Sequence, residues 1–122
     1  MNASDGTVDI VINQDQVVVI PRGWWKAFSL RRRLLVPLAS VVSAHVANDP
    51  TTEIRVRFRV GGTSTLSIRA GYMRGDGTRS WWCYRYGQPA VVIALALPKL
   101  TNLVIMTDNN EATVAALNAK AR

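Results

Sequence analysis

The feature that most restricts the fold of this chain is a series of short segments in which apolar residues recur at every second position. In the first of them, Val8, Ile10 and Ile12 alternate with Asp9 and Val11, the pattern of a strand with one buried face. Turn-forming residues separate this segment from the next, and the arrangement recurs along the chain. Short strands at this spacing predict a β-sandwich or a partly open β-barrel.

The other segments predict a mostly β domain with irregular connections. Segment 24–30 fits a short helical turn or a bent strand, and we assign it to neither. Pro37 divides segment 32–47 into two strands or breaks one strand, because proline cannot donate to a sheet ladder. Gly61-Gly62 is expected to end a strand, and Arg74-Gly75-Asp76-Gly77 to form a tight turn. The expected strands are 8–12, 16–20, 32–38, 41–47, 54–60, 66–70, 78–86, 91–97 and 103–107.

Only the end of the chain changes to a helical period. Asp108 is placed to cap a helix, and Glu111 lies three residues later, as in a capping box. The residues that follow are rich in alanine, and Val114, Leu117 and Ala121 can form one apolar stripe. The pattern predicts one C-terminal helix packed against an open end of the β structure.

Segment 54–60 has the most regular alternation in the chain. We expect its apolar face to be core and its other face, which carries three arginines, to be exposed. The apolar residues are Ile54, Val56, Phe58 and Val60, and the arginines are Arg55, Arg57 and Arg59. The arginines either bind an anionic partner or simply occupy a solvated face and protect an edge strand from pairing.

Length and composition favour one folded domain over residues 1–122, with 1–6 disordered. The chain is 48% hydrophobic, yet its longest apolar run, 90–97, is far shorter than the roughly 20 residues of a membrane span. We expect a cytoplasmic protein, because residues 1–6 lack a secretory pattern and Cys83 is the single cysteine.

Catalytic machinery is not recognisable in the sequence. His45 is the one histidine and fits a surface position on a strand, while Cys83 fits a small packing residue between two aromatics. The eight acidic residues are scattered, which argues against a metal site. We therefore expect no enzyme activity, no cofactor and no specific small-molecule substrate.

The charge balance raises the odds of an anionic partner. The net charge is +7, and twelve of the fifteen basic residues are arginine, which favours bidentate contacts to carboxylate or phosphate. A GC-rich genome would produce the same arginine bias. Two adjacent tryptophan pairs add aromatic surface, and one member of each pair should be exposed because neighbours in a strand point to opposite faces. The candidate interaction surface comprises Arg31, Arg32, Arg33, Arg55, Arg57, Arg59, Trp24 and Trp81.

We interpret this surface as the site of a non-enzymatic interaction module that binds a protein partner or forms a homodimer. The alternative is a basic module for acidic lipid or nucleic acid. Salt separates the two hypotheses, because binding to a phosphate backbone weakens steeply with salt and a largely apolar interface does not.

Several residue groups resemble small stand-alone bacterial (actinobacterial) pleckstrin-homology-like domains. In the first half these are Val17-Val18-Val19, Gly23-Trp24-Trp25-Lys26 and Leu35-Val36-Pro37-Leu38 leading into Val41-Val42. In the second half they are Ala70-Gly71, Trp82, Arg85, Val91-Val92-Ile93 and Leu103-Val104-Ile105 before Asp108. The resemblance implies a meander of about seven strands closed by one helix. It does not imply headgroup binding between the first two strands, because the loop Asn13-Gln14-Asp15-Gln16 carries no base.

Overall fold

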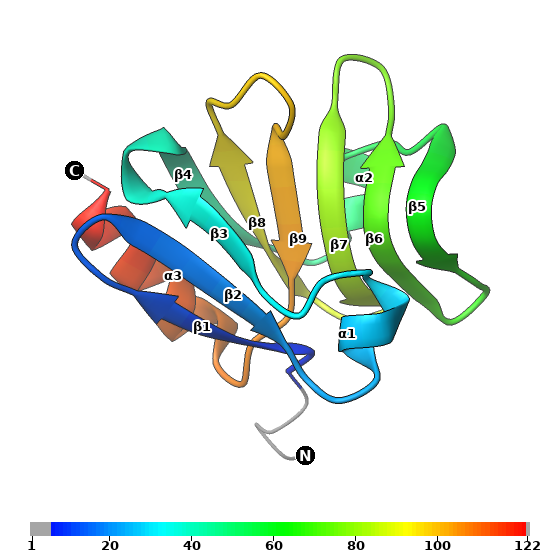
Figure 1. Cartoon of the computed structure of the whole chain (residues 1–122), viewed down its shortest axis with the longest axis horizontal. Helices are drawn as coiled ribbons and strands as arrows, with labels where there is room; N and C mark the ends of the chain where they lie inside the picture. Colours follow the sequence, from blue (N-terminus) through cyan, green and yellow to red (C-terminus); the bar gives the residue numbers. More distant parts are fainter. Residues whose placement is uncertain (1–5, 122) are drawn as a thin grey trace.

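The structure is a computed structural model that describes residues 6–121. Within these residues nine strands form two sheets, and a helix follows the last strand (Figure 1). The chain is mostly β, as predicted, but the sheets do not close into a barrel. The smaller sheet is antiparallel, with β1 (Val8–Ile12) paired to β2 (Gln16–Pro21) and β2 to β3 (Leu34–Pro37). The predicted first hairpin is confirmed.

The larger sheet has the order β4-β8-β9-β7-β6-β5. Its strands are β4 (Val41–Ala47), β5 (Phe58–Ser64), β6 (Ile68–Arg74), β7 (Arg79–Arg85), β8 (Ala90–Leu95) and β9 (Asn102–Ile105). All neighbours are antiparallel except β7 and β9, which are parallel. Because β9 lies between β7 and β8, the expected meander is wrong. The resemblance implied about seven strands, which is too few. Of the two alternatives for segment 32–47, the division into two strands is confirmed, because Pro37 and the 3₁₀ turn η1 (Leu38–Ser40) separate β3 and β4, which join different sheets.

The central strands of the larger sheet, β7, β8 and β9, are buried on both faces. The inner face of this sheet packs against the smaller sheet and forms the inner core, which includes Trp81 and Cys83 of β7. Its outer face forms a second, outer core, which includes Trp82 and Tyr84. The alternation predicted for β7 is therefore confirmed. The prediction that one of the two tryptophans is exposed is wrong, because both faces of β7 are covered and Trp81 and Trp82 are each 0% exposed.

The outer core is closed by the connection between β4 and β5, which we call the crossing segment (residues 48–57). These two strands are opposite edges of the larger sheet, so the connection has to cross the outer face. It contains the short helix α2 (Pro50–Glu53) and then Ile54, which is 4% exposed and packs in the outer core. The predicted strand 54–60 is thus wrong in its first half, because β5 begins at Phe58.

Gly61-Gly62 does not end β5, contrary to the prediction. Gly62 lies directly opposite Gly71 of β6, and their φ angles are 119° and 103°. A Cβ on either glycine would lie 2.2 Å from a carbonyl oxygen of the other strand. The two glycines let the backbones of β5 and β6 approach closely, and the pairing of these strands continues to Ser64.

The C-terminal helix is α3 (Asn110–Lys120), and it begins later than predicted. Its N-cap is Asn109, whose side chain accepts a hydrogen bond from the Ala112 N–H at 3.0 Å. Asp108 does not cap the helix, because its carboxylate pairs with Arg22 instead. The apolar stripe is confirmed, since Leu117 is fully buried in the inner core. The helix lies against β1, β4 and β8, at one end of the space between the sheets (Figure 1).

The connection between β2 and β3 contains one turn of helix, α1 (Trp25–Phe28), where we assigned no structure. It packs on β5 and β6. Gly6, expected to be disordered, is buried and donates to Asp108, while residues 1–5 lie outside the described part of the chain. No helix within residues 6–121 has the length and apolar character to cross a membrane.

Candidate functional site

The residues predicted to form one interaction surface do not meet in one place. Trp81 is in the inner core and cannot contact a partner. Trp24 is 78% exposed at the start of α1, while its neighbour Trp25 is buried. The prediction that one member of the tryptophan pair is exposed is therefore confirmed for this pair. Arg32 and Arg33 are exposed in the connection that follows α1.

The three alternating arginines do not form a face either. Arg55 belongs to the crossing segment, outside any strand. Arg57 Nε pairs with Asp76 Oδ1 at 2.7 Å, and Arg59 donates to the Gly62 carbonyl oxygen at 3.2 Å. Because the strand begins only at Phe58, the period of two that would align the arginines is absent over most of the segment.

A different surface is exposed on the inner face of β5, β6 and β7. In Figure 1 the smaller sheet and α1 lie over the other part of that face and leave the upper ends of these strands uncovered. The strand register pairs Phe58, Arg74 and Arg79 in one row across the sheet. The next row on the same face consists of Gly61, Tyr72 and Trp81. Directly paired residues point to the same side of a sheet, so the first row shares the inner face with Trp81.

We call this surface the basic–apolar face. Its members are Leu30, Arg31, Phe58, Val60, Tyr72, Arg74, Arg79 and Lys99. A hollow of about 100 Å³ is lined by Val60, Tyr72 and three of the cations, Arg74, Arg79 and Lys99. From the connection after α1, Arg31 Nε donates to the Tyr72 hydroxyl at 2.7 Å, and the Leu30 side chain lies over Gly61.

The apolar members of this face are exposed although their positions belong to the inner face. Phe58 is 53% exposed and Val60 is 62% exposed. The prediction that they share one buried face with Ile54 and Val56 is wrong, because Ile54 and Val56 pack in the outer core and no layer covers Phe58 and Val60. A β-bulge at Val60, between the pairs Arg59–Met73 and Gly61–Tyr72, adds to the irregularity of this edge strand.

The cations of the basic–apolar face lack acidic partners. The ion pairs between residues 6–121 involve Arg22, His45 and Arg57, and none of them involves a cation of this face. Arg31, Arg74, Arg79 and Lys99 therefore leave their positive charge unneutralised, although Arg79 also donates to the Pro98 carbonyl oxygen. Four such charges beside exposed apolar groups form a positive field at an apolar surface. Sequence reasoning missed Arg74 and Arg79, although their positions on either side of the predicted tight turn indicate that they are cross-strand neighbours.

Leu30 adds backbone strain to this face. Its φ is +63°, a left-handed conformation that usually falls to glycine. It occupies the residue after the C-cap of α1, where its N–H donates to Ala27 and the Arg31 N–H donates to Lys26. The side chain held there is 62% exposed. Strained residues of this kind cluster at functional sites.

Cys83 and His45, the single cysteine and the single histidine, lie in different parts of the fold. Burial raises the pKa of Cys83 to about 12, although a hydrogen bond with Ser29 opposes that rise, so its thiol is protonated at neutral pH. His45 pairs with Glu53 on the exposed side of β4. In the part of the chain that the structure describes, no three His, Cys, Asp or Glu side chains converge as metal ligands would.

The functional assignment rests on this geometry and on the sequence. No protein-family model, curated protein or solved structure matches the chain. The resemblance to pleckstrin-homology-like domains therefore stays a prediction.

Proposed function

We propose that this chain is a non-enzymatic binding module that recognises an acidic surface of a partner protein through the basic–apolar face. The observation that carries the proposal is the coexistence of exposed Leu30, Phe58 and Val60 with four cations that have no carboxylate partner. An acidic partner would neutralise those charges, and its apolar groups would cover the exposed side chains.

The composition of the face favours a protein over the other anionic partners. Arginine, tyrosine and phenylalanine are the residue types enriched at protein interfaces. Its apolar members Phe58, Val60 and Tyr72 lie on the strands β5 and β6 beside a hollow, which suits a folded partner better than a lipid surface. A second copy of this chain is disfavoured at this face, since a symmetric dimer would bring the four cations of each copy together.

The scaffold assignment is part of the same proposal. Two sheets with a C-terminal helix support a pleckstrin-homology-like module, whereas the parallel pairing of β7 with β9 departs from a simple meander. The function proposed for the basic–apolar face does not depend on that assignment.

The test is affinity capture from native lysate with three forms of the full chain, followed by salt titration of the complex that is captured. One variant replaces Arg74, Arg79 and Lys99 with Gln, and a matched control replaces the exposed Arg32, Arg55 and Arg59 with Gln. We expect the first variant to lose an acidic protein that the control retains.

Binding of all three forms to vesicles with phosphatidylserine and to a heparin column is measured in parallel. Equal losses from both variants, or selective loss of vesicle or heparin binding alone, would contradict the proposal.

A further inference from the structure

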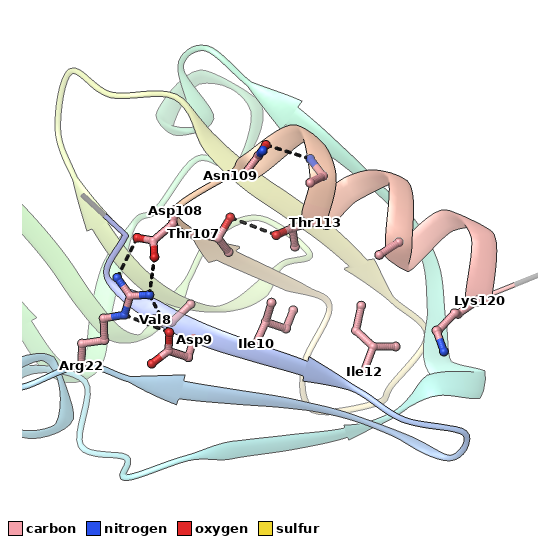
Figure 2. A pocket seen from close by; sticks show the side chains of 12 residues that line it. Val8, Asp9, Ile10, Ile12, Arg22, Thr107, Asp108, Asn109, Thr113 and Lys120 are labelled. Atoms are coloured by element: carbon pink, nitrogen blue, oxygen red, sulfur yellow. Dashed lines mark hydrogen bonds and ion pairs between the residues drawn. The ribbon is translucent and has the colours of Figure 1, made fainter. Parts of the chain in front are cut away.

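A groove of about 440 Å³ lies between β1 and α3 (Figure 2). These two elements lie on the other side of the molecule from β5, β6 and β7 (Figure 1). Figure 2 shows the Ile10 and Ile12 side chains of β1 pointing toward the helix. The helix contributes the small residues Ala112, Thr113 and Ala116 to the opposite wall. The floor and walls of the groove are therefore largely apolar.

The groove runs along a free strand edge. In the smaller sheet β1 pairs only with β2, so one side of β1 has no neighbouring strand among residues 6–121. The Arg22 N–H donates to Thr7 and the Asn13 N–H donates to Gln16, which fixes the alternation of the ladder. Asp9, Val11 and Asn13 direct their backbone N–H and C=O toward β2, and Val8, Ile10 and Ile12 direct theirs outward. Thr7 offers only its C=O to β2, because its N–H donates to the Met106 carbonyl oxygen at 2.8 Å. The Val8 N–H is taken by the Met106 carbonyl, which leaves the N–H and C=O of Ile10 and Ile12 for an added strand.

The other sheet edges are protected. The amide of Asn118 bonds to both the N–H and the C=O of Ala44, so α3 blocks the edge of β4. The outward positions of β3 are Leu35 and Pro37, and proline has no N–H to offer. The edge of β5 is interrupted by the bulge at Val60 and by Gly62. Natural proteins usually protect such edges, and β1 is the regular one left open among the described strands.

The two ends of the groove carry opposite charge. At one end Arg22 bonds to Asp108 through two contacts of 2.8 Å and also to Asp9, so one guanidinium faces two carboxylates. At the other end lies Lys120, and the two carboxylates that line the groove are both at the Arg22 end (Figure 2). A ligand with an acidic group near Lys120 and a basic group near Asp9 and Asp108 complements this pattern.

We propose that β1 accepts an added antiparallel strand from a partner protein. The occupant is an extended segment with apolar side chains at alternate positions, an acidic residue at its N-terminal end near Lys120, and a basic residue at its C-terminal end near Asp9. Main-chain hydrogen bonds to Ile10 and Ile12 supply affinity, and the groove and its charged ends supply specificity. This site is separate from the basic–apolar face, so either proposal can fail without the other.

The probe is a capped seven-residue peptide, Glu-Val-Thr-Val-Thr-Val-Lys, titrated into the isotope-labelled full chain. Amide hydrogen exchange is followed by NMR. We expect a dissociation constant below about 1 mM and exchange at Ile10 and Ile12 slowed by about tenfold or more, with little change at Asp9 and Val11, whose amides already face β2. The same peptide with its valine and threonine amides N-methylated should not protect these residues, and the peptide with its two charged ends exchanged should bind more weakly.

A helix variant tests the groove from its other wall. Ala116→Phe fills the space beside β1 and should weaken peptide binding by about tenfold. Ala115→Phe is the matched control, because Ala115 is exposed on α3 and does not line the groove, and it should bind as the unmodified chain does. No protection of Ile10 and Ile12 in the unmodified chain at about 5 mM peptide would overturn the proposal. Equal protection by the N-methylated peptide, or equal weakening by the two variants, would also overturn it.

Discussion

At the scale of one residue, Leu30 places an apolar side chain on the basic–apolar face at a cost to the stability of the fold. It is the one non-glycine residue with a positive φ within residues 6–121. A left-handed conformation costs an L-residue about 1 kcal/mol relative to glycine. Its side chain is exposed, so the fold recovers little of that cost by burial.

We therefore expect Leu30→Gly to raise the free energy of unfolding by up to about 1 kcal/mol while weakening the binding of the partner. Chemical denaturation and the captured complex give the two readouts. Leu30→Ala is the control, since it removes the same apolar surface but keeps the strain. A variant Leu30→Gly that is less stable than Leu30→Ala would show that the conformation is not strained.

At the scale of elements, Ile54 and Phe58 separate the crossing segment from the edge strand. Sequence alternation assigned both residues to one buried face, but only Ile54 is buried. We expect Ile54→Ala to cost about 2–4 kcal/mol, because it opens a cavity in the outer core. Phe58→Ala should cost less than about 1 kcal/mol, since its ring is half exposed on the basic–apolar face. Urea denaturation of both variants measures the two losses of stability. A larger loss for Phe58→Ala than for Ile54→Ala would contradict this structure and favour a continuous strand over 54–60.

The start of α3 gives a second test at this scale. Asn109→Ala should lower the free energy of unfolding by about 1 kcal/mol at any pH, because it removes the N-cap. Asp108 acts differently. Arg22 holds the pKa of Asp108 below its ordinary value, so its contribution is present above that value and lost as the pH falls through the lowered pKa. Asp108→Ala should therefore match the unmodified chain in acid and be less stable near neutrality. Denaturation curves across this pH range measure both, and a deficit that persists in acid would assign the cap to Asp108.

The elements themselves show what local pattern can and cannot predict. The β1–β2 hairpin, the turn after Arg74 and the C-terminal helix were predicted because their signals are short-range. The two-sided burial of β7 was not, because a strand's own sequence does not say how many layers cover it. For the same reason Trp81 was placed on the surface, and Phe58 and Val60 in the core.

At the scale of the whole molecule, the parallel placement of β9 between β7 and β8 could not be predicted from alternation. The pairing of β9 with β7 and β8 joins segments far apart in sequence, and it depends on which apolar faces the complete sheets can bury. The basic–apolar face follows from the same arrangement. Two of its cations, Arg74 and Arg79, lie on the adjacent strands β6 and β7, and the other two, Arg31 and Lys99, come from the connections after α1 and after β8. The face is exposed because the smaller sheet covers only part of the larger one (Figure 1). Arg31 was the one member of that face that the sequence placed in a candidate site.

The central claim is that this uncovered face is where the partner binds, and hydrogen–deuterium exchange with and without the captured partner tests it most directly. The account predicts slower exchange in the connections around the face, residues 29–33, 75–78 and 96–101, and at the start of β5. Exchange in β4 and in the crossing segment should stay unchanged. Protection confined to the crossing segment, or no change in the three connections at saturation, would contradict the claim.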